Sequence, residues 1–167
     1  MKRIVFLLAV AVGSSMNVFA QGAKNIKINE VMTHNTSSIE DGYGQHEAWI
    51  ELCNVSHTTL NVRGMYITTN KAVLNKELSV PERQKLMSVI PSNDVRTNLH
   101  GHQFLTFFFN SNPNKSTLQN DTKTEPGKPL WVALYDGNCI NLIDSVSIPA
   151  LLPDYSYARK ENGSSEW

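Results

Sequence analysis

The fold is decided by residues 26–54, which read IKINEVMTHNTSSIEDGYGQHEAWIELCN. Apolar and polar residues alternate over 26–31, and a second run of strand length occupies 49–53. Alternation of period two is typical of a half-buried β-strand. The polar, glycine-containing residues between the two runs favour a loop. The stretch therefore predicts two strands joined by a surface loop.

Runs of the same kind continue along the chain. They occupy residues 59–62, 65–69, 104–109, 130–135, 140–146 and 155–159. Asp136, Gly137 and Asn138 mark a hairpin turn between two of these runs. Seven or eight short strands separated by Gly, Asn and Asp predict an all-β protein, either a sandwich or a barrel.

One helix is expected over residues 81–88, as an insertion between strands. Ser79 can cap it, Pro81 is tolerated in a first turn, and Glu82 favours the positive end of the helix dipole. Residues 110–129 are polar and rich in Asn, Pro, Lys and Thr, which predicts a long surface loop.

The N-terminus has the pattern of a secretory signal peptide. Lys2 and Arg3 precede an apolar run over residues 4–12, and small residues lie at and two positions before Ala20. Nine residues in a helix span about 14 Å, whereas a bilayer core is about 30 Å thick. We therefore expect residues 1–20 to be a signal peptide and the protein to be exported, to a bacterial periplasm or cell surface.

Length and charge limit the remaining classes. Residues 21–167 suit one domain of ordinary size. Lysine plus arginine number 15, as do aspartate plus glutamate, whereas nucleic-acid-binding proteins usually show a basic excess. We expect no nucleic-acid partner. Export would permit a disulfide between Cys53 and Cys139, but neither belongs to a paired motif, and we expect both thiols to be free.

Two groups of residues contain metal-ligand types. The first consists of Glu40, Asp41, His46 and Glu47. Its spacing matches no calcium loop, and a solvated acidic loop is the alternative interpretation. His100 and His102 would share one strand face, but further zinc ligands are missing from any recognisable motif nearby. No GxSxG nucleophile elbow or glycine-rich phosphate loop is present. We expect no catalytic residue, no metal ion and no cofactor.

Several motifs together resemble the lamin tail domain family. They are INEVM at 28–32, AWIELCN at 48–54, LNVRGMYIT at 60–68, LYD at 134–136, IDSV at 143–146, and SYAR at 156–159 with NGS and Trp167 behind it. The resemblance covers nearly all of residues 21–167. It departs at Cys53, where an aromatic residue is usual, and in the long insertion over 71–101.

The resemblance implies an immunoglobulin-like β-sandwich of about 7–9 short strands, with one short helix in the insertion and no catalysis of its own. The family-motif residues, expected to be structural, are Asn29, Glu30, Trp49, Glu51, Asn54, Gly64, Tyr66, Asp136, Asp144, Tyr157 and Arg159. Family members continue past the final tryptophan, so we expect the domain over 21–167 to be incomplete at its C-terminal end.

A narrower resemblance is carried by Asp41, Tyr43, Gly44, Gln45, Ala48 and Trp49. It is to the exported N-terminal part of Bacteroidetes membrane proteins related to the gamma subunit of sodium-pumping decarboxylases. It implies a periplasmic module that is membrane-tethered through residues beyond this chain.

These resemblances leave three functions open. The first is a non-catalytic, exported module that binds a protein or assembles a membrane or cell-envelope complex. The second is an extracellular carbohydrate-binding or polysaccharide-processing module, with its site in loops 33–47 and 110–129; no motif supports a carbohydrate partner. The third is an adhesion or spacer module.

Overall fold

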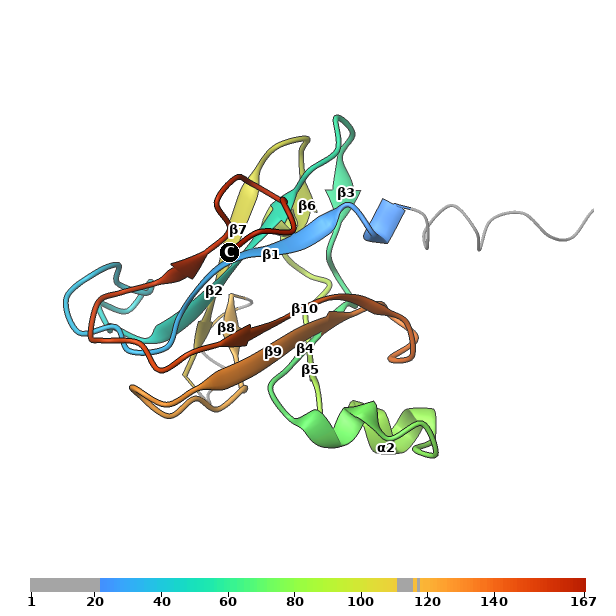
Figure 1. The fold of residues 1–167 in the computed structure, drawn as a ribbon. Helices are drawn as coiled ribbons and strands as arrows, with labels where there is room; N and C mark the ends of the chain where they lie inside the picture. Colours follow the sequence, from blue (N-terminus) through green and yellow to red (C-terminus); the bar gives the residue numbers. More distant parts are fainter. Residues whose placement is uncertain (1–21, 111–115, 117) are drawn as a thin grey trace, which may run out of the picture.

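The computed structural model describes residues 22–110, 116 and 118–167. The predicted signal peptide lies outside the described residues. In the part of the chain that is described, two β-sheets face each other (Figure 1). The chain is therefore an all-β sandwich with a short helix, as the strand pattern predicts.

The larger sheet has five strands in the order β11–β1–β2–β7–β8. They are β1 (Ile26–Met32), β2 (Ala48–Asn54), β7 (Phe104–Phe109), β8 (Gln119–Asn120) and β11 (Tyr157–Ala158). All neighbours pair antiparallel except β7 and β8, which are parallel. A bulge in β1 between Ile28 and Glu30 shifts its register against β2. This sheet carries the two strands predicted from residues 26–54.

The second sheet has four strands in the order β10–β9–β4–β5. They are β4 (Tyr66–Thr68), β5 (Ser88–Val89), β9 (Leu130–Tyr135) and β10 (Leu142–Ile148). A separate pair joins β3 (Leu60–Asn61) to β6 (Asn98–Leu99). The described residues thus form eleven strands rather than 7–9, because β5, β6 and β8 add to the eight predicted runs. Each of these three is only two residues long and leaves no periodic pattern.

The main core lies between the two sheets. Its fully buried residues come from alternate positions of both, and they include Ile28, Ile50, Leu52, Phe107, Ile67, Leu134 and Ile148. The alternation expected from the sequence places these side chains inward, while their neighbours along each strand face outward. Burial of these side chains is the main force that holds the sheets together.

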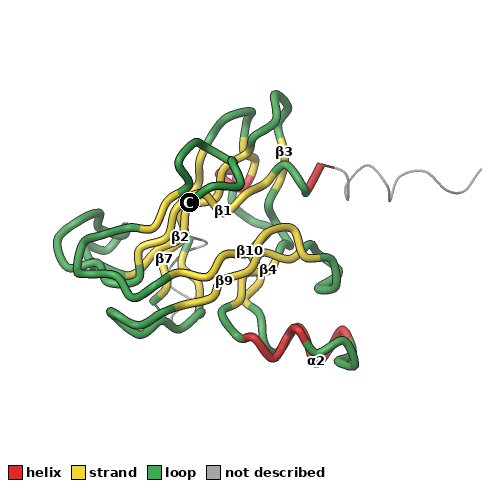
Figure 2. Tube along the Cα trace, in the orientation of Figure 1, coloured by secondary structure: helices red, strands yellow, loops and turns green. Residues whose placement is uncertain are grey.

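The helical insertion covers the outer face of the four-stranded sheet. It contains the 3₁₀ helix η1 (Lys71–Leu74) and α2 (Val80–Gln84), and a second 3₁₀ helix, η2 (Val95–Thr97), follows β5. Figures 1 and 2 show α2 on the side of β4 that faces away from β1. Val73 packs there against Ala133 and Tyr135 in a small second core.

The predicted helix over 81–88 is shorter than expected. The Ser79 amide and hydroxyl both donate to the Glu82 carboxylate, at 2.8 and 2.6 Å, which fixes the start. The helix ends at Gln84, and Ser88 begins β5, where it pairs with Ile67 of β4. Strand pairing therefore replaces the last predicted turn.

The predicted surface loop over 110–129 also needs a correction. Gln119 and Asn120 form β8 and are buried, and Thr122 is buried just after it. Because these residues are polar, the sequence predicts exposure, whereas the edge of β7 supplies the hydrogen bonds that bury them.

Both cysteines are buried and free. Burial raises the pKa of the Cys53 thiol to about 11 and also raises that of Cys139. No helix in the described ranges is long and apolar enough to cross a bilayer.

Candidate functional site

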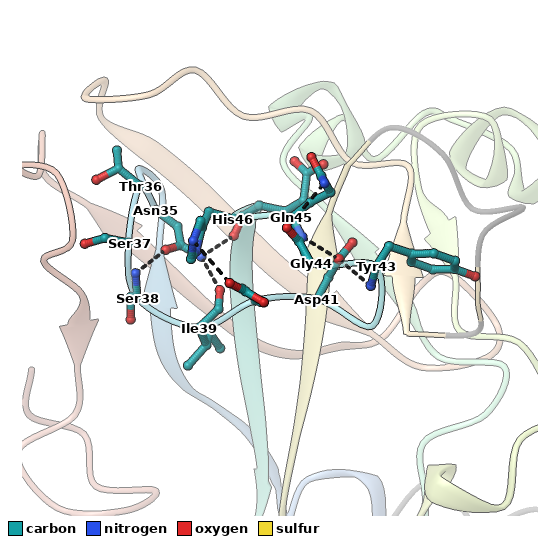
Figure 3. Close-up of polar contacts among 12 residues, drawn as sticks. Asn35, Thr36, Ser37, Ser38, Ile39, Asp41, Tyr43, Gly44, Gln45 and His46 are labelled. Atoms are coloured by element: carbon teal, nitrogen blue, oxygen red, sulfur yellow. Dashed lines mark hydrogen bonds and ion pairs between the residues drawn. The ribbon is translucent and has the colours of Figure 1, made fainter.

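The loop over residues 33–47 connects β1 to β2 and extends beyond one end of the larger sheet (Figure 1). A connection of this length between two paired strands would be loose if it were held only at its ends. Three polar side chains instead fix its backbone along the way, and Figure 3 shows two of them, Asn35 and Asp41.

Asp154 anchors the first part of the loop. Its carboxylate accepts the amides of Thr36 and Ser37 at 2.7 and 2.9 Å, and their hydroxyls at 2.5 and 2.8 Å. The Asp154 amide in turn donates to the His34 carbonyl at 2.8 Å. These hydrogen bonds from Thr36 and Ser37 hold the pKa of the carboxyl well below its usual range. The anchor is therefore ionised at neutral pH.

Asn35 closes the base of the loop. Its side-chain amide donates to the carbonyls of Ile39 and Glu47, at 2.7 and 3.0 Å, and its oxygen accepts the Ser38 amide. The side chain is buried, so each of these bonds is protected from competition with water. One asparagine thereby joins the two sides of the loop.

Asp41 holds the tip. One carboxylate oxygen accepts the amides of Tyr43 and Gln45, at 2.8 and 2.9 Å, and the other accepts the Gln119 side chain at 2.9 Å. Gly44 lies in the left-handed region, at φ +72°, which this tight turn requires. The tip is thus tied both to itself and to β8.

The acidic segment with Glu40, Asp41, His46 and Glu47 belongs to this loop. Asp41 is buried and engaged by the loop, while Glu40 lies 3.7 Å from His46 at the surface. The described residues contain no group of three or more His, Cys, Asp or Glu side chains placed to hold a metal ion. The segment is an internally bonded loop.

The fixed loop presents apolar side chains to solvent. Ile39 is 42% exposed and Tyr43 is 52% exposed. The Tyr43 ring projects outward from the loop backbone (Figure 3). At the base lies a pocket of about 260 Å³, whose lining includes His34, His46 and Phe109. The loop therefore combines a rigid backbone with an exposed isoleucine and tyrosine.

Trp49 lies at the foot of this loop, on the outer face of the larger sheet. It packs between Met32 and Phe108, which are its cross-strand neighbours on β1 and β7. The indole is only 6% exposed, and its N–H has no acceptor among the described residues. Trp49 is thus a buried anchor, but of a small outer cluster and not of the main core.

The motif residues Asp144 and Arg159 join the two sheets. Their side chains lie 2.7 Å apart and are 13% and 5% exposed. Asp144 also accepts the Ile28 amide at 2.9 Å, and Arg159 donates to the Ile28 carbonyl at 2.7 Å and to the Ser164 carbonyl. One buried ion pair therefore connects β10, β1 and the C-terminal segment.

A second motif group lies on the outer face of β1 and β2. Asn29 donates to Glu51 at 3.0 Å and accepts the Gly163 amide, while Glu30 lies opposite Glu51 across the strands. Burial raises the pKa of Glu51, the Asn29 hydrogen bond opposes that shift, and the Glu30 charge adds to it. The Cys53 thiol points to the same asparagine, at 3.7 Å.

The remaining motif residues shape turns and the C-terminal segment. Tyr157 stacks on Trp167 with ring centroids 5.3 Å apart, and the Arg159 guanidinium lies 4.5 Å from the centre of the Trp167 ring. The Asn54 side chain donates to the carbonyls of Thr58 and Leu99, at 2.7 and 2.9 Å. These contacts serve the fold.

Gly64, Tyr66 and Asp136 are placed around the four-stranded sheet. Gly64 adopts φ +74°, Tyr66 accepts a hydrogen bond from Gln84 at 3.2 Å, and Asp136 caps the β9–β10 turn by accepting the Asn138 amide and the Asn141 side chain. The Gly64 amide also donates to the Ile90 carbonyl at 2.8 Å, so each of the three motif residues has a local structural contact.

Comparisons of this chain with protein-family models, with curated proteins and with solved structures found no match.

His100 and His102 do not share the one strand face that the sequence predicts for them. His100 follows β6, and His102 adopts a left-handed φ of +61° in the next turn. His100 bonds to Thr59 and His102 bonds to His57. The sequence also gives no signal for Asp154, because its partners lie about 118 residues away along the chain.

Proposed function

We propose that this protein is an exported, non-catalytic β-sandwich of the lamin-tail, immunoglobulin-like type, and that it binds a protein partner through its 33–47 loop. The observation that carries the proposal is the loop itself. Asp154, Asn35 and Asp41 fix its backbone, and Ile39 and Tyr43 stand exposed on it.

A loop of this kind is well suited to recognition. Ordering a loose loop during association costs conformational entropy, and a loop that is already ordered avoids that cost. Tyrosine supplies a large contact area with few rotatable bonds, which is why it is enriched where proteins bind each other. Loops at the end of a rigid sandwich are common sites of such contacts.

The motif residues support the non-catalytic part of the proposal. Asp144, Arg159, Asn29 and Glu51 direct their polar atoms to each other and to the backbone. Polar groups that hydrogen-bond to each other and to the backbone stabilise the fold. The binding surface that we propose is the 33–47 loop, which contains none of these four residues.

The proposed location is the cell envelope, and the basis for it is the signal-peptide pattern before residue 21. The narrower resemblance, through residues 41–49, overlaps the same loop. We therefore propose that the partner belongs to an envelope or membrane complex, of which this domain is the periplasmic part.

A site-specific crosslink tests the proposal. A photo-reactive phenylalanine derivative replaces Tyr43 in the full chain, expressed in the organism that encodes it. We expect one discrete crosslinked protein. The matched control carries the same probe at Val95, which is 82% exposed on η2. No crosslink at position 43, or the same product from position 95, would contradict the proposal.

One observation favours a second candidate function, the binding of a polysaccharide. A polar pocket of about 430 Å³ lies between β4, the end of the helical insertion and residues 121–123, and Asp121 and Lys123 are part of its lining. Saturating carbohydrate at 100 times its Kd would stabilise the fold by about 2.7 kcal/mol. A shift of the melting temperature that disappears in Asp121→Ala, and persists in Lys76→Ala, would support this candidate.

A further inference from the structure

Two exposed histidines face each other on neighbouring turns. His57 lies between β2 and β3, and His102 lies between β6 and β7. Nε2 of His102 is 3.0 Å from Nδ1 of His57, and the ring centroids are 4.7 Å apart with planes at 72°. The two imidazole nitrogens that face each other are of the kind that binds transition metals.

The backbone holds these turns together. The His102 amide donates to the Asn54 carbonyl at 2.8 Å, and the Asn54 amide donates to the Gln103 carbonyl at 3.0 Å. Gly101 lies so close to the other turn that a Cβ there would be 2.7 Å from the Ser56 carbonyl oxygen. His102 itself adopts φ +61°, a region that side chains rarely occupy. The two imidazoles are therefore brought together by fixed main chain.

We propose that His57 and His102 form a two-histidine binding site for a divalent first-row transition metal, with Cu²⁺ bound more tightly than Zn²⁺. Two nitrogens that bind one tetrahedral ion at 2.0–2.1 Å lie about 3.3 Å from each other. To meet that value the observed spacing must widen by about 0.3 Å, and each exposed ring must turn by about 35° so that both nitrogens point at the ion. The preference for Cu²⁺ follows from the general order of affinity of nitrogen sites.

Metal binding at this site needs no loss of a proton overall. In the hydrogen-bonded pair one facing nitrogen carries the proton and the other accepts it. When the metal binds both nitrogens, the donor ring takes its other tautomer, with the proton on the opposite nitrogen. Both rings are exposed, so water can supply that nitrogen with a hydrogen-bond partner and can fill the remaining metal positions.

His100 supplies a matched control. It lies two residues from His102, but its Nδ1 is 2.8 Å from the Thr59 hydroxyl, which directs it to a different partner. The two cysteines are buried, so in the folded protein they do not compete for the metal.

The test is calorimetric titration of the tag-free chain with Cu²⁺ and with Zn²⁺ at pH 7.5. We expect one equivalent of Cu²⁺, with an electron paramagnetic resonance spectrum showing imidazole nitrogen ligands. His57→Ala and His102→Ala should each weaken binding by at least about tenfold, and His100→Ala by less than about twofold. Equal melting temperatures without metal would show that all variants are folded.

Three results would overturn the proposal. They are the absence of one-equivalent Cu²⁺ binding by the wild-type chain, unchanged affinity in the His57→Ala, His102→Ala double variant, and an equal loss of affinity in His100→Ala.

Discussion

Asp144 and Asp154 lie ten residues apart in the sequence and use the same hydrogen-bonding chemistry in two different regions. Asp144 is nearly buried, pairs with Arg159 and accepts the Ile28 amide, so that it joins the two sheets. Asp154 lies near the surface and accepts four bonds from Thr36 and Ser37, so that it fixes one loop. The first carboxylate stabilises the fold, whereas the second orders a surface.

The difference has an energetic basis. A buried charge that loses its partner cannot recover the lost interaction from water. A carboxylate at the surface is hydrated when its partners leave, and only the local backbone order is lost. Changes in the first region should therefore unfold the domain, while changes in the second should loosen the 33–47 loop alone.

The largest effect is expected from Arg159→Ala. It leaves Asp144 buried without a cation and removes the bond to the Ile28 carbonyl. We expect a loss of about 4 kcal/mol in the free energy of unfolding, measured by denaturant titration. The control, Lys160→Ala, breaks only the exposed pair with Glu166 and should cost about 0.5 kcal/mol. Equal losses in the two variants would remove the distinction between buried and surface pairs.

Trp49→Ala should have the next largest effect. It opens a cavity between Met32 and Phe108, and we expect a loss of about 3 kcal/mol. Trp49→Phe keeps an aromatic ring and removes the unbonded N–H, so it should cost about 1 kcal/mol or less. A loss below about 1 kcal/mol for the alanine variant, with ligand binding abolished instead, would make Trp49 a surface site.

The Asp154 anchor should resist acid. Its pKa is lowered in the folded state, so its contribution is fully present above the ordinary aspartate value of about 4 and is lost as the pH falls through the lower folded value. We expect the amides of Thr36 and Ser37 to remain protected from hydrogen exchange at pH 4. Loss of their protection between pH 6 and pH 4, while the sheets stay intact, would contradict the assigned anchor.

The smallest effect concerns the thiols. Cys53 and Cys139 are buried and free, so mass spectrometry of the unreduced protein should find no crosslink between them. A reducing agent should leave the melting temperature unchanged. A quantitative disulfide between Cys53 and Cys139, or a fall of the melting temperature on reduction, would contradict this prediction.

The sequence predicts the long strands because their side chains alternate or form continuous apolar runs. β1, β2, β7 and β9 all lie within one residue of the predicted ranges. β8 is missed because Gln119 and Asn120 are polar, and their burial depends on parallel pairing with β7 and on the bond from Gln119 to Asp41, 78 residues away in sequence. Local pattern carries no information about such a partner.

The candidate site is less predictable than the fold. The sequence identifies 33–47 as a loop, but its rigidity depends on Asp154 and Gln119, which reach it across long separations. The expectation that His100 and His102 share one strand face was wrong for a related reason. A left-handed residue at His102 turns its ring toward His57, so the strand geometry assumed for His100 and His102 does not apply.

Hydrogen exchange of wild type and Asp154→Gly, measured side by side, tests the central claim that the 33–47 loop is ordered separately from the fold. Glycine removes the carboxylate and tolerates the left-handed φ of +63° at this position. The amides of Thr36 and Ser37 bond to Asp154, and the Ile28 amide bonds to Asp144. We predict that the variant loses protection at Thr36 and Ser37 while Ile28 keeps its own. Loss of protection at all three amides together, or at none of them, would contradict the claim.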